Sequence, residues 1–319
     1  MDSRTFKEHS TRNEQPPSRS HGPNVAASPP IHEPVQVRAQ RVLAGRSFDF
    51  SREVAVMAIV NRTPDSFYDK GKTFALDQAV AAARAAIVDG ADWVDVGGVP
   101  FARGTEVTVA EEIDRVLPVV EALRGSGAVV SVDTFRAEVA RRSIAAGAHV
   151  INDTSGLRDP EMVSVVADTD ASLIVTHSLA ARSGPPRYTD VVVEVAAFLR
   201  ARIAFATSSG LPAERIIIDP GFDLDKNTLH SLTLIRRLHE VAAIGLPMLA
   251  AVSNKDFVGE TLGDPSLRSV GSLAAAVACI LQGARIVRAH EVAATVAAVR
   301  LTEAILGFRA PAFMRHNAE

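Results

Sequence analysis

The sequence is poor in cysteine and in long apolar runs, and its charges nearly balance. Cys279 is the one cysteine among 319 residues, which excludes a disulfide framework within the chain, and the apolar run 273–281 around it predicts a buried, unreactive thiol. No apolar segment approaches the length that spans a bilayer, and the N-terminus lacks the hydrophobic segment of a secretion signal. The net charge of −3 gives no indication of a nucleic-acid or membrane partner. We therefore expect a cytoplasmic protein.

Several common functional signatures are absent as well. No glycine-rich dinucleotide fingerprint follows the first predicted strand, where an open nucleotide-binding sheet would carry one. His177 and His290 lack companion ligands at zinc spacing. No Ser-His-Asp arrangement can be recognised from the sequence. The chemistry must therefore come from another kind of site.

The chain divides into a polar tail and a regular α/β region. Residues 1–45 are rich in Ser, Pro, Asn, Glu and Arg, which predicts a disordered tail. From about residue 53, short β-rich runs alternate with Ala-rich helical stretches. The predicted strands are 54–60, 92–96, 128–132, 149–151, 172–176, 215–218, 248–252 and 285–288. A predicted helix follows each of them, at 76–89, 108–124, 136–146, 160–167, 189–209, 228–243, 266–282 and 291–307.

The number of repeats indicates the fold class. Gly90, Gly147 and Gly283 each follow a predicted helix, as expected of a helix C-cap. Eight βα units within about 260 residues favour a (β/α)₈ TIM barrel over an open doubly wound sheet. In such a barrel the functional groups lie at the C-terminal ends of the strands.

Every predicted strand ends in polar side chains. One such end is unremarkable, because a helix N-cap often lies there, and Asp133, Asp153 and Asp219 taken singly are explained equally well as caps. Eight ends together, mixing acid, amide, ammonium, guanidinium and imidazole, predict one binding site. The residues are Asn61, Asp95, Asp133 with Thr134, Asn152 with Asp153, Thr176 with His177, Asp219, Ser253 to Lys255, and Arg288 with His290.

The first of these strand ends opens the segment 61–67, which reads Asn-Arg-Thr-Pro-Asp-Ser-Phe. Taken alone, this segment has good turn chemistry, and a turn is the simpler interpretation. Its place among the other polar strand ends makes Asn61 and Asp65 candidates for function.

The side chains of this ring match two kinds of ligand group. Carboxylates together with an amide and Lys255 suit a planar heterocycle that has N–H donors and carbonyl acceptors. Arg288 and His290 beside Asn61 suit an anion, because arginine binds phosphate through two parallel N–H groups. Asn61 could also help to hold a Mg²⁺ ion that bridges diphosphate oxygens.

Seven short segments, in the same order, resemble the signatures of the dihydropteroate synthase family: 57–67, 95–98, 131–134, 151–153, 219–222, 253–255 and 287–290. The resemblance extends over residues 54–308 and implies a pterin-binding barrel at 46–319. Members of that family are (β/α)₈ barrels, usually homodimers. They join 6-hydroxymethyl-7,8-dihydropterin diphosphate to p-aminobenzoate in folate biosynthesis, and release diphosphate with Mg²⁺ present.

The resemblance also implies roles for individual residues. Asp65 is a candidate for electrostatic support of a pterin cation, and Lys255 is the other catalytic candidate. Asp95 and Arg103 are candidates near the second loop, and Asn61 is the candidate metal ligand. Pterin binding is implied for Asp133, Asn152, Asp219 and Lys255, and diphosphate binding for Asn61, Arg288 and His290.

Departures from the family pattern are concentrated on the p-aminobenzoate side. The second loop, 97–104, lacks the family's Ser-Thr pair, and its arginine comes one place late. Arg62 puts a cation in the first loop, and 223–226 reads Asp-Leu-Asp-Lys where the family has Gly-Phe-Gly-Lys. Asp256 follows the lysine near a helix start that receives the benzoate carboxylate in the family. We expect Asp256 either to occupy that anion position or to act as an N-cap.

Three functions remain open after these comparisons of sequence pattern. The first is a dihydropteroate synthase with an adapted acceptor pocket, and the second is a pterin-binding paralogue with impaired catalysis. The third, a pterin-dependent methyltransferase, is disfavoured because a methyl carrier gives no reason for a diphosphate site at Asn61, Arg288 and His290.

Overall fold

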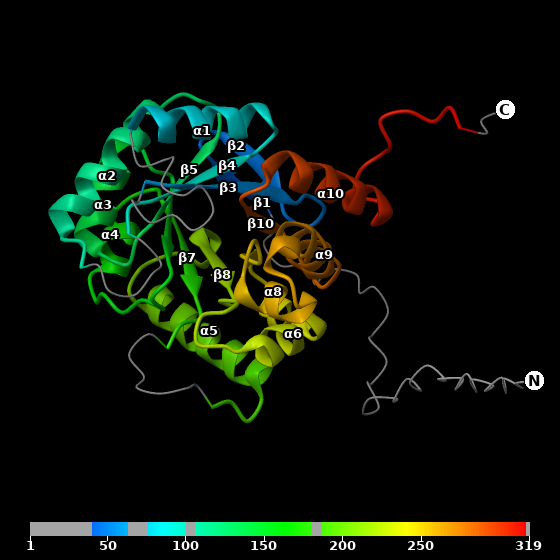
Figure 1. Ribbon diagram of the computed structural model, residues 1–319. Coiled ribbons are helices and arrows are strands. Elements are labelled where there is room, and N and C mark those ends of the chain that lie inside the picture. Colours follow the sequence, from blue (N-terminus) through cyan, green and yellow to red (C-terminus); the bar gives the residue numbers. More distant parts are fainter. Residues whose placement is uncertain (1–39, 63–75, 100–105, 180–186, 317–319) are drawn as a thin grey trace, which may run out of the picture. The chain divides into compact units, whose positions relative to one another are not determined.

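The computed structural model describes residues 40–62, 76–99, 106–179 and 187–316 (Figure 1). Eight parallel strands pair in the order β8-β7-β6-β5-β4-β3-β10-β9. The two end strands meet through a parallel bridge between Ile218 and Met248, which closes the sheet into a barrel. The strands are β3 (Ala55–Asn61), β4 (Trp93–Gly97), β5 (Val129–Asp133), β6 (Val150–Asp153), β7 (Ser172–Thr176), β8 (Ile216–Asp219), β9 (Leu249–Ala250) and β10 (Ile286–Ala289).

Helices alternate with these strands and surround them in Figure 1. They are α1 (Leu76–Val88), α2 (Val109–Ala122), α3 (Ala137–Ala146), α4 (Met162–Ala167), α5 (Val191–Ser208), α6 (Thr228–Arg236), α7 (Leu238–Ala242), α8 (Asp256–Leu262), α9 (Arg268–Leu281) and α10 (Val292–Ile305). Short 3-10 turns lie at Ala213–Arg215 and Pro265–Leu267. The predicted (β/α)₈ barrel is confirmed, and each predicted strand lies within two residues of its expected limits.

Three features differ from the prediction. An antiparallel hairpin, β1 (Gln40–Leu43) and β2 (Arg46–Asp49), begins inside the segment 1–45 that was predicted as a tail; residues 1–39 lie outside the described part of the chain. The predicted helix 228–243 is divided into α6 and α7 at Arg237, and α8 was not predicted. The helix α8 has seven residues, too few to show a 3.6-residue hydrophobic period.

The hairpin closes the N-terminal end of the barrel. Phe48 and the following Phe50 stack with ring centroids 5.7 Å apart, and both meet the edge of Trp93 from β4. Because side chains alternate across a strand, every second strand residue points inward. These residues form an inner apolar cluster with the hairpin, made of Leu43, Phe48, Phe50, Ala55, Met57, Trp93, Val129, Val150, Ile174, Ile217, Leu249 and Ile286.

The other strand residues point outward and pack against the helices. They are mostly valine, isoleucine and alanine, which suits parallel strands that are covered on both faces. Cys279 on α9 lies fully buried in this outer layer, as predicted, and burial raises the pKa of its thiol. None of the described helices is both long and apolar enough to cross a bilayer.

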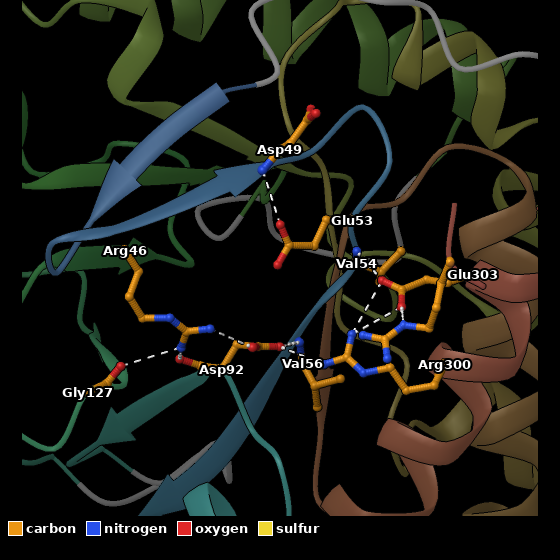
Figure 2. Close-up of polar contacts among 10 residues, drawn as sticks. Arg46, Asp49, Glu53, Val54, Val56, Asp92, Gly127, Arg300 and Glu303 are labelled. Carbon is orange, nitrogen blue, oxygen red and sulfur yellow. Dashed lines mark hydrogen bonds and ion pairs between the residues drawn. The ribbon is translucent and has the colours of Figure 1, made fainter. Parts of the chain in front are cut away.

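Asp92 connects the hairpin to the first two barrel strands (Figure 2). Its carboxylate accepts hydrogen bonds from the backbone N–H of Val56 at 3.1 Å and from Arg46 Nη2 at 3.0 Å. Arg300 of α10 lies 3.8 Å from the same carboxylate. The last helix and the hairpin therefore meet at one acidic side chain.

Glu303 of α10 makes a second connection at this end of the barrel (Figure 2). The side chain is buried and accepts a hydrogen bond of 2.9 Å from the backbone N–H of Val54. Arg300 and Arg309 neutralise it at 3.1 and 3.0 Å. A buried carboxylate needs such partners, because an unpaired charge away from water is costly.

Candidate active site

Above the inner apolar cluster, the inward-facing positions change from apolar to polar. Asp95 lies two residues after Trp93 on β4 and is fully buried. Its carboxylate accepts hydrogen bonds from Ser131 Oγ at 2.6 Å, Asn152 Nδ2 at 3.1 Å and Arg288 Nε at 2.7 Å. Asp95, which the sequence assigned to the neighbourhood of the second loop, is therefore the central acceptor of a polar layer. We call this layer, at the C-terminal ends of the strands, the barrel mouth.

Arg288 bridges two carboxylates across the barrel mouth. Besides Asp95, its Nη2 donates to Asp133 Oδ2 at 3.1 Å. Burial lowers the pKa of Arg288, but the two carboxylates outweigh burial and raise the pKa overall, so the guanidinium stays charged. Burial raises the pKa of Asp133, and Asp95 and Glu112 raise it further, while Arg288 opposes them. A guanidinium shared by two acids can rearrange when a ligand takes over one partner.

Three predicted site residues, Asn61, Asp133 and Asn152, lie in one row of the sheet together with Gly97. The strand register pairs Asn61 with Gly97, Gly97 with Asp133, and Asp133 with Asn152. A side chain on Gly97 would lie 2.9 Å from Asn61 Oδ1, so the glycine leaves room between Asn61 and Asp133. Asn152 is buried, and within the described residues its Oδ1 has no hydrogen-bond partner. This oxygen is an available acceptor for a ligand N–H.

Asp219 and Lys255 lie on the other side of the barrel mouth. Asp219 Oδ1 accepts a hydrogen bond of 2.7 Å from the backbone N–H of Gly221, as an N-cap would. Burial raises the pKa of Asp219, whereas the nearby positive charge of Lys255 lowers it. Burial also lowers the pKa of Lys255, while Asp219 and Asp133 raise it. The predicted pterin-binding residues Asp133, Asp219 and Lys255 therefore lie close enough to influence one another's pKa.

His177 belongs to a structural contact next to this corner. Its Nδ1 lies 2.9 Å from Nζ of the buried Lys226, which also donates to the carbonyls of Gly221 and Leu224. Burial lowers the pKa of Lys226 to about 7, and burial together with Lys226 lowers the pKa of His177 to about 3. His177 is therefore a neutral acceptor that helps Lys226 to hold the turn after β8.

The anion position at the start of α8 is occupied, but not by Asp256. The backbone N–H groups of Asp256 and Phe257 donate to Asp223 Oδ2 at 2.6 and 3.4 Å. The Asp256 side chain is 72% exposed and pairs with Arg268 at 2.7 Å. The expectation that Asp256 takes the anion position, or caps the helix, is wrong; a carboxylate from the turn after β8 does so instead.

Arg62 points away from the barrel mouth and binds α2. Its Nη1 donates to the carbonyls of Asp114 at 2.9 Å and Arg115 at 3.0 Å. Within α2, Pro118 has no N–H to donate to the carbonyl of Asp114 four residues earlier. The Arg62 side chain supplies a donor to that carbonyl and ties the end of β3 to α2.

Replacing Arg62 by methionine should lower the free energy of unfolding by about 1 kcal/mol, because the Asp114 carbonyl loses its side-chain donor. Urea unfolding measures this difference. The matched background is Pro118→Ala, in which the alanine N–H can bond to Asp114 within the helix. The loss should shrink in that background, and an equal loss in both would show that Arg62 does not act through this carbonyl.

His290 and Ser253 form a pair beside the barrel mouth. His290 Nδ1 lies 3.0 Å from Ser253 Oγ, and the backbone N–H of His290 donates to the same hydroxyl at 3.2 Å. The Arg288 guanidinium, by contrast, faces Asp95 and Asp133. The two side chains predicted to share the diphosphate thus have different protein partners.

The remaining candidates divide into two groups. Asp65 and Arg103 lie outside the described residues. Asp153 is a turn cap, since its Oδ1 accepts from the backbone N–H of Ser155 at 2.7 Å. Sequence reasoning gave no role to Ser131, although it precedes Asp133 by two residues and so faces inward with it.

The donor set at the barrel mouth fits a metal ion only in part. Within the described ranges, no group of three or more His, Cys, Asp or Glu residues could hold a metal ion. The amide oxygen of Asn61 is a hard donor of the kind that Mg²⁺ accepts. Mg²⁺ often keeps several waters and binds through substrate phosphates. The residues therefore fit an ion that arrives with a diphosphate.

Comparisons with known proteins agree with this geometry. Residues 57–290 match the model of a family described as pterin binding enzyme. A polar barrel mouth and this match together define a pterin-binding enzyme scaffold. The curated protein named inactive dihydropteroate synthase 2 of Mycobacterium tuberculosis H37Rv is 45% identical over 280 residues, covering 84% of this chain and 88% of that one. Dihydropteroate synthase of Escherichia coli K12 is 41% identical over 268 residues, covering 82% and 95%. The chain therefore belongs to the dihydropteroate synthase family.

Solved structures are similar over the same part of the chain. Dihydropteroate synthase of Xanthomonas albilineans with 4-aminobenzoic acid has a TM-score of 0.78 and 39% identity, covering 84% of this chain and 98% of that one. The Yersinia pestis synthase in a sulfonamide drug complex has a TM-score of 0.79 and 36% identity, covering 85% and 100%. The barrel described above is thus shared with transferases of this family.

Proposed function

We propose that this chain binds 6-hydroxymethyl-7,8-dihydropterin diphosphate at the barrel mouth and transfers its pterin group to p-aminobenzoate, releasing diphosphate. The observation that carries the proposal is the buried polar layer above the apolar cluster, in which Asn152 Oδ1 has no hydrogen-bond partner among the residues that the structure describes. A solved synthase of X. albilineans holds 7,8-dihydropteroate, which supports a pterin ligand for this scaffold.

In this proposal Asp133, Asp219 and Asn152 accept the N–H groups of the pterin, and the Lys255 ammonium donates to its ring acceptors. Asn61, Arg288 and His290 bind the diphosphate, and Asp65 supports the developing pterin cation. The bond between the pterin methylene carbon and the diphosphate oxygen breaks, and the arylamine nitrogen bonds to that carbon and then loses a proton. Stabilising the departing charge is the main task of the protein.

Mg²⁺ would be held by the Asn61 amide oxygen and the diphosphate oxygens, where it would neutralise charge on the leaving group. We also propose a cytoplasmic homodimer. Exposed apolar side chains on two adjacent helices, Val270 of α9 and Leu301 and Ile305 of α10, support an interface there.

A second candidate, pterin binding with impaired transfer, is favoured by one observation. Asp223 occupies the backbone N–H groups at the start of α8, so they are not available to the carboxylate of an acceptor. The M. tuberculosis relative named as inactive is consistent with that candidate.

Diphosphate release distinguishes the two candidates. Release from the pterin diphosphate with Mg²⁺ should increase when p-aminobenzoate is added, and calorimetry should detect pterin binding without it. Lys255→Met should weaken pterin binding, whereas Arg142→Met, an exposed α3 residue paired with Glu138, serves as a control and should not. Binding without stimulated release would establish the second candidate, and absence of pterin binding would contradict both.

A further inference from the structure

The two lysines in the described part of the chain lie in one corner of the barrel. Of the five lysines in the sequence, Lys7, Lys70 and Lys72 lie outside the described residues. Lys226 ends the turn after β8 and Lys255 directly precedes α8. Burial lowers the pKa of Lys226, and the positive charge of Lys255 lowers it further. Two neighbouring ammonium groups, of which Lys226 is buried and Lys255 half-buried, need negative charge beside them.

That charge comes from a turn with unusual backbone geometry. Asp223 and Asp225 have φ values of 63° and 52°, in the left-handed region. This conformation costs an L-residue roughly 1–2 kcal/mol, somewhat less for aspartate, and glycine would avoid the cost. The chain therefore keeps two carboxylates at positions where glycine is the more favourable residue.

The contacts of Asp223 account for its presence. Its Oδ2 accepts from the first two backbone N–H groups of α8, at Asp256 and Phe257, and Ser231 Oγ of α6 donates to its Oδ1 at 3.3 Å. Lys255 is the residue that directly precedes these two amides. Holding them fixes the backbone from which the Lys255 side chain extends.

The charges around Lys255 come from four elements. Asp223 in the turn after β8 is the strongest of the groups that oppose the effect of burial on the pKa of Lys255, ahead of Asp219 on β8 and Asp133 on β5. Arg288 on β10 acts in the opposite direction. Removal of the Asp223 charge should therefore lower the pKa of Lys255 more than any other single change.

Asp225 has a separate task in the same turn. Its Oδ2 accepts from the backbone N–H of Leu179 at 2.6 Å, in the loop after β7. Burial lowers the pKa of Lys226, and the charges of Asp219, Asp225 and Asp223 oppose this effect in that order of size. Asp225 is not among the main charges that act on Lys255.

We propose that Asp223 is a positioning residue for Lys255: it fixes the start of α8 and supplies the negative charge that keeps the Lys255 ammonium protonated in the barrel mouth. Asp225 anchors the same turn to the loop after β7 and, together with Asp219, supplies negative charge beside Lys226. The inference rests on the proposed function only for the task that it gives Lys255, which is to donate to the pterin.

The test uses the full chain labelled with ¹³C at lysine, whose ε-carbon resonances report the protonation of each ammonium. Lys255→Met and Lys226→Met assign the two signals. Asp223→Asn keeps an oxygen that accepts the α8 amides but removes the charge. It should lower the titration midpoint of Lys255 by about one pH unit or more and shift Lys226 less. Asp225→Asn is the matched control and should shift Lys226 and not Lys255.

Pterin diphosphate binding provides the second measurement. Binding should weaken at high pH as Lys255 loses its proton. This alkaline loss of affinity should occur at lower pH in Asp223→Asn and stay unchanged in Asp225→Asn. An unshifted Lys255 signal in Asp223→Asn, or an equal shift in Asp225→Asn, overturns the inference. If the unsubstituted chain does not bind the pterin diphosphate, the proposed function fails, while the lysine titration still decides the pairing.

Discussion

Replacing Arg288 by methionine should lower the free energy of unfolding by about 3–5 kcal/mol at neutral pH, because it leaves the carboxylates of Asp95 and Asp133 without their shared cation. Asp95 is fully buried, so water cannot replace the guanidinium there. Affinity for the pterin diphosphate should fall at least about thirtyfold, since the same side chain is proposed to bind the diphosphate. Urea unfolding and calorimetry measure the two effects.

The matched control is Arg285→Met, near the start of the same strand. Arg285 is even more buried than Arg288 but donates to the carbonyls of Ile280 and Ala284 rather than to carboxylates, so its loss should cost about 1–2 kcal/mol. Adding Asp95→Asn to Arg288→Met should restore part of the stability by removing the unpaired charge. Equal losses for the two arginines, with no rescue by Asp95→Asn, would contradict the assigned charge pairing.

The second large effect is expected from Gly221→Ala, which should cost about 4 kcal/mol or more. Gly221 has a φ of +69°, and a methyl group there would overlap the backbone carbonyl oxygen of His177. A backbone carbonyl cannot move away from the methyl group as the end of a flexible side chain could. The displaced turn would also disturb the carbonyl that accepts from Lys226. Thermal unfolding followed by circular dichroism measures the loss.

Gly210→Ala separates the two contributions to this loss. Gly210 also has a positive φ, +96°, but no atom of the described residues lies within 4 Å of a methyl group placed there. Gly210→Ala should therefore lower the free energy of unfolding only by the strain of the left-handed backbone, roughly 1–2 kcal/mol. If the two alanine variants lose the same stability, the contact with His177 has no part in the effect.

The barrel strands could be predicted because their signal is local. Outward and inward positions are both apolar over most of each strand, so runs such as 128–132 and 172–176 stand out against the helices between them. The change to polar residues at the strand ends then located Asp95, Asp133, Asn152, Asp219 and Arg288. The structure brings these five side chains to one end of the barrel, as expected.

The contacts that could not be predicted from the sequence join residues that are far apart in the chain. The carboxylate at the start of α8 comes from Asp223, 33 residues before the amide that it accepts, so adjacency pointed instead to Asp256. Arg62 looked like an added charge in the first loop. Its contact is instead with the carbonyl of Asp114 in α2, which Pro118 leaves without a helical N–H donor. Helix α8 and the short hairpin carry too few residues for a periodic pattern.

The contacts of Glu303 have a consequence for how the protein is made. Val54, just before the first barrel strand, gives its N–H to Glu303, which is 249 residues later in the chain, and Arg309 completes the charge balance. Synthesis proceeds from the N-terminus at about 5–20 residues per second, so many seconds separate the emergence of these partners. During that interval the early strands and the hairpin have no α10 to hold them. The closed end of the barrel can therefore be completed only when the last helix has left the ribosome.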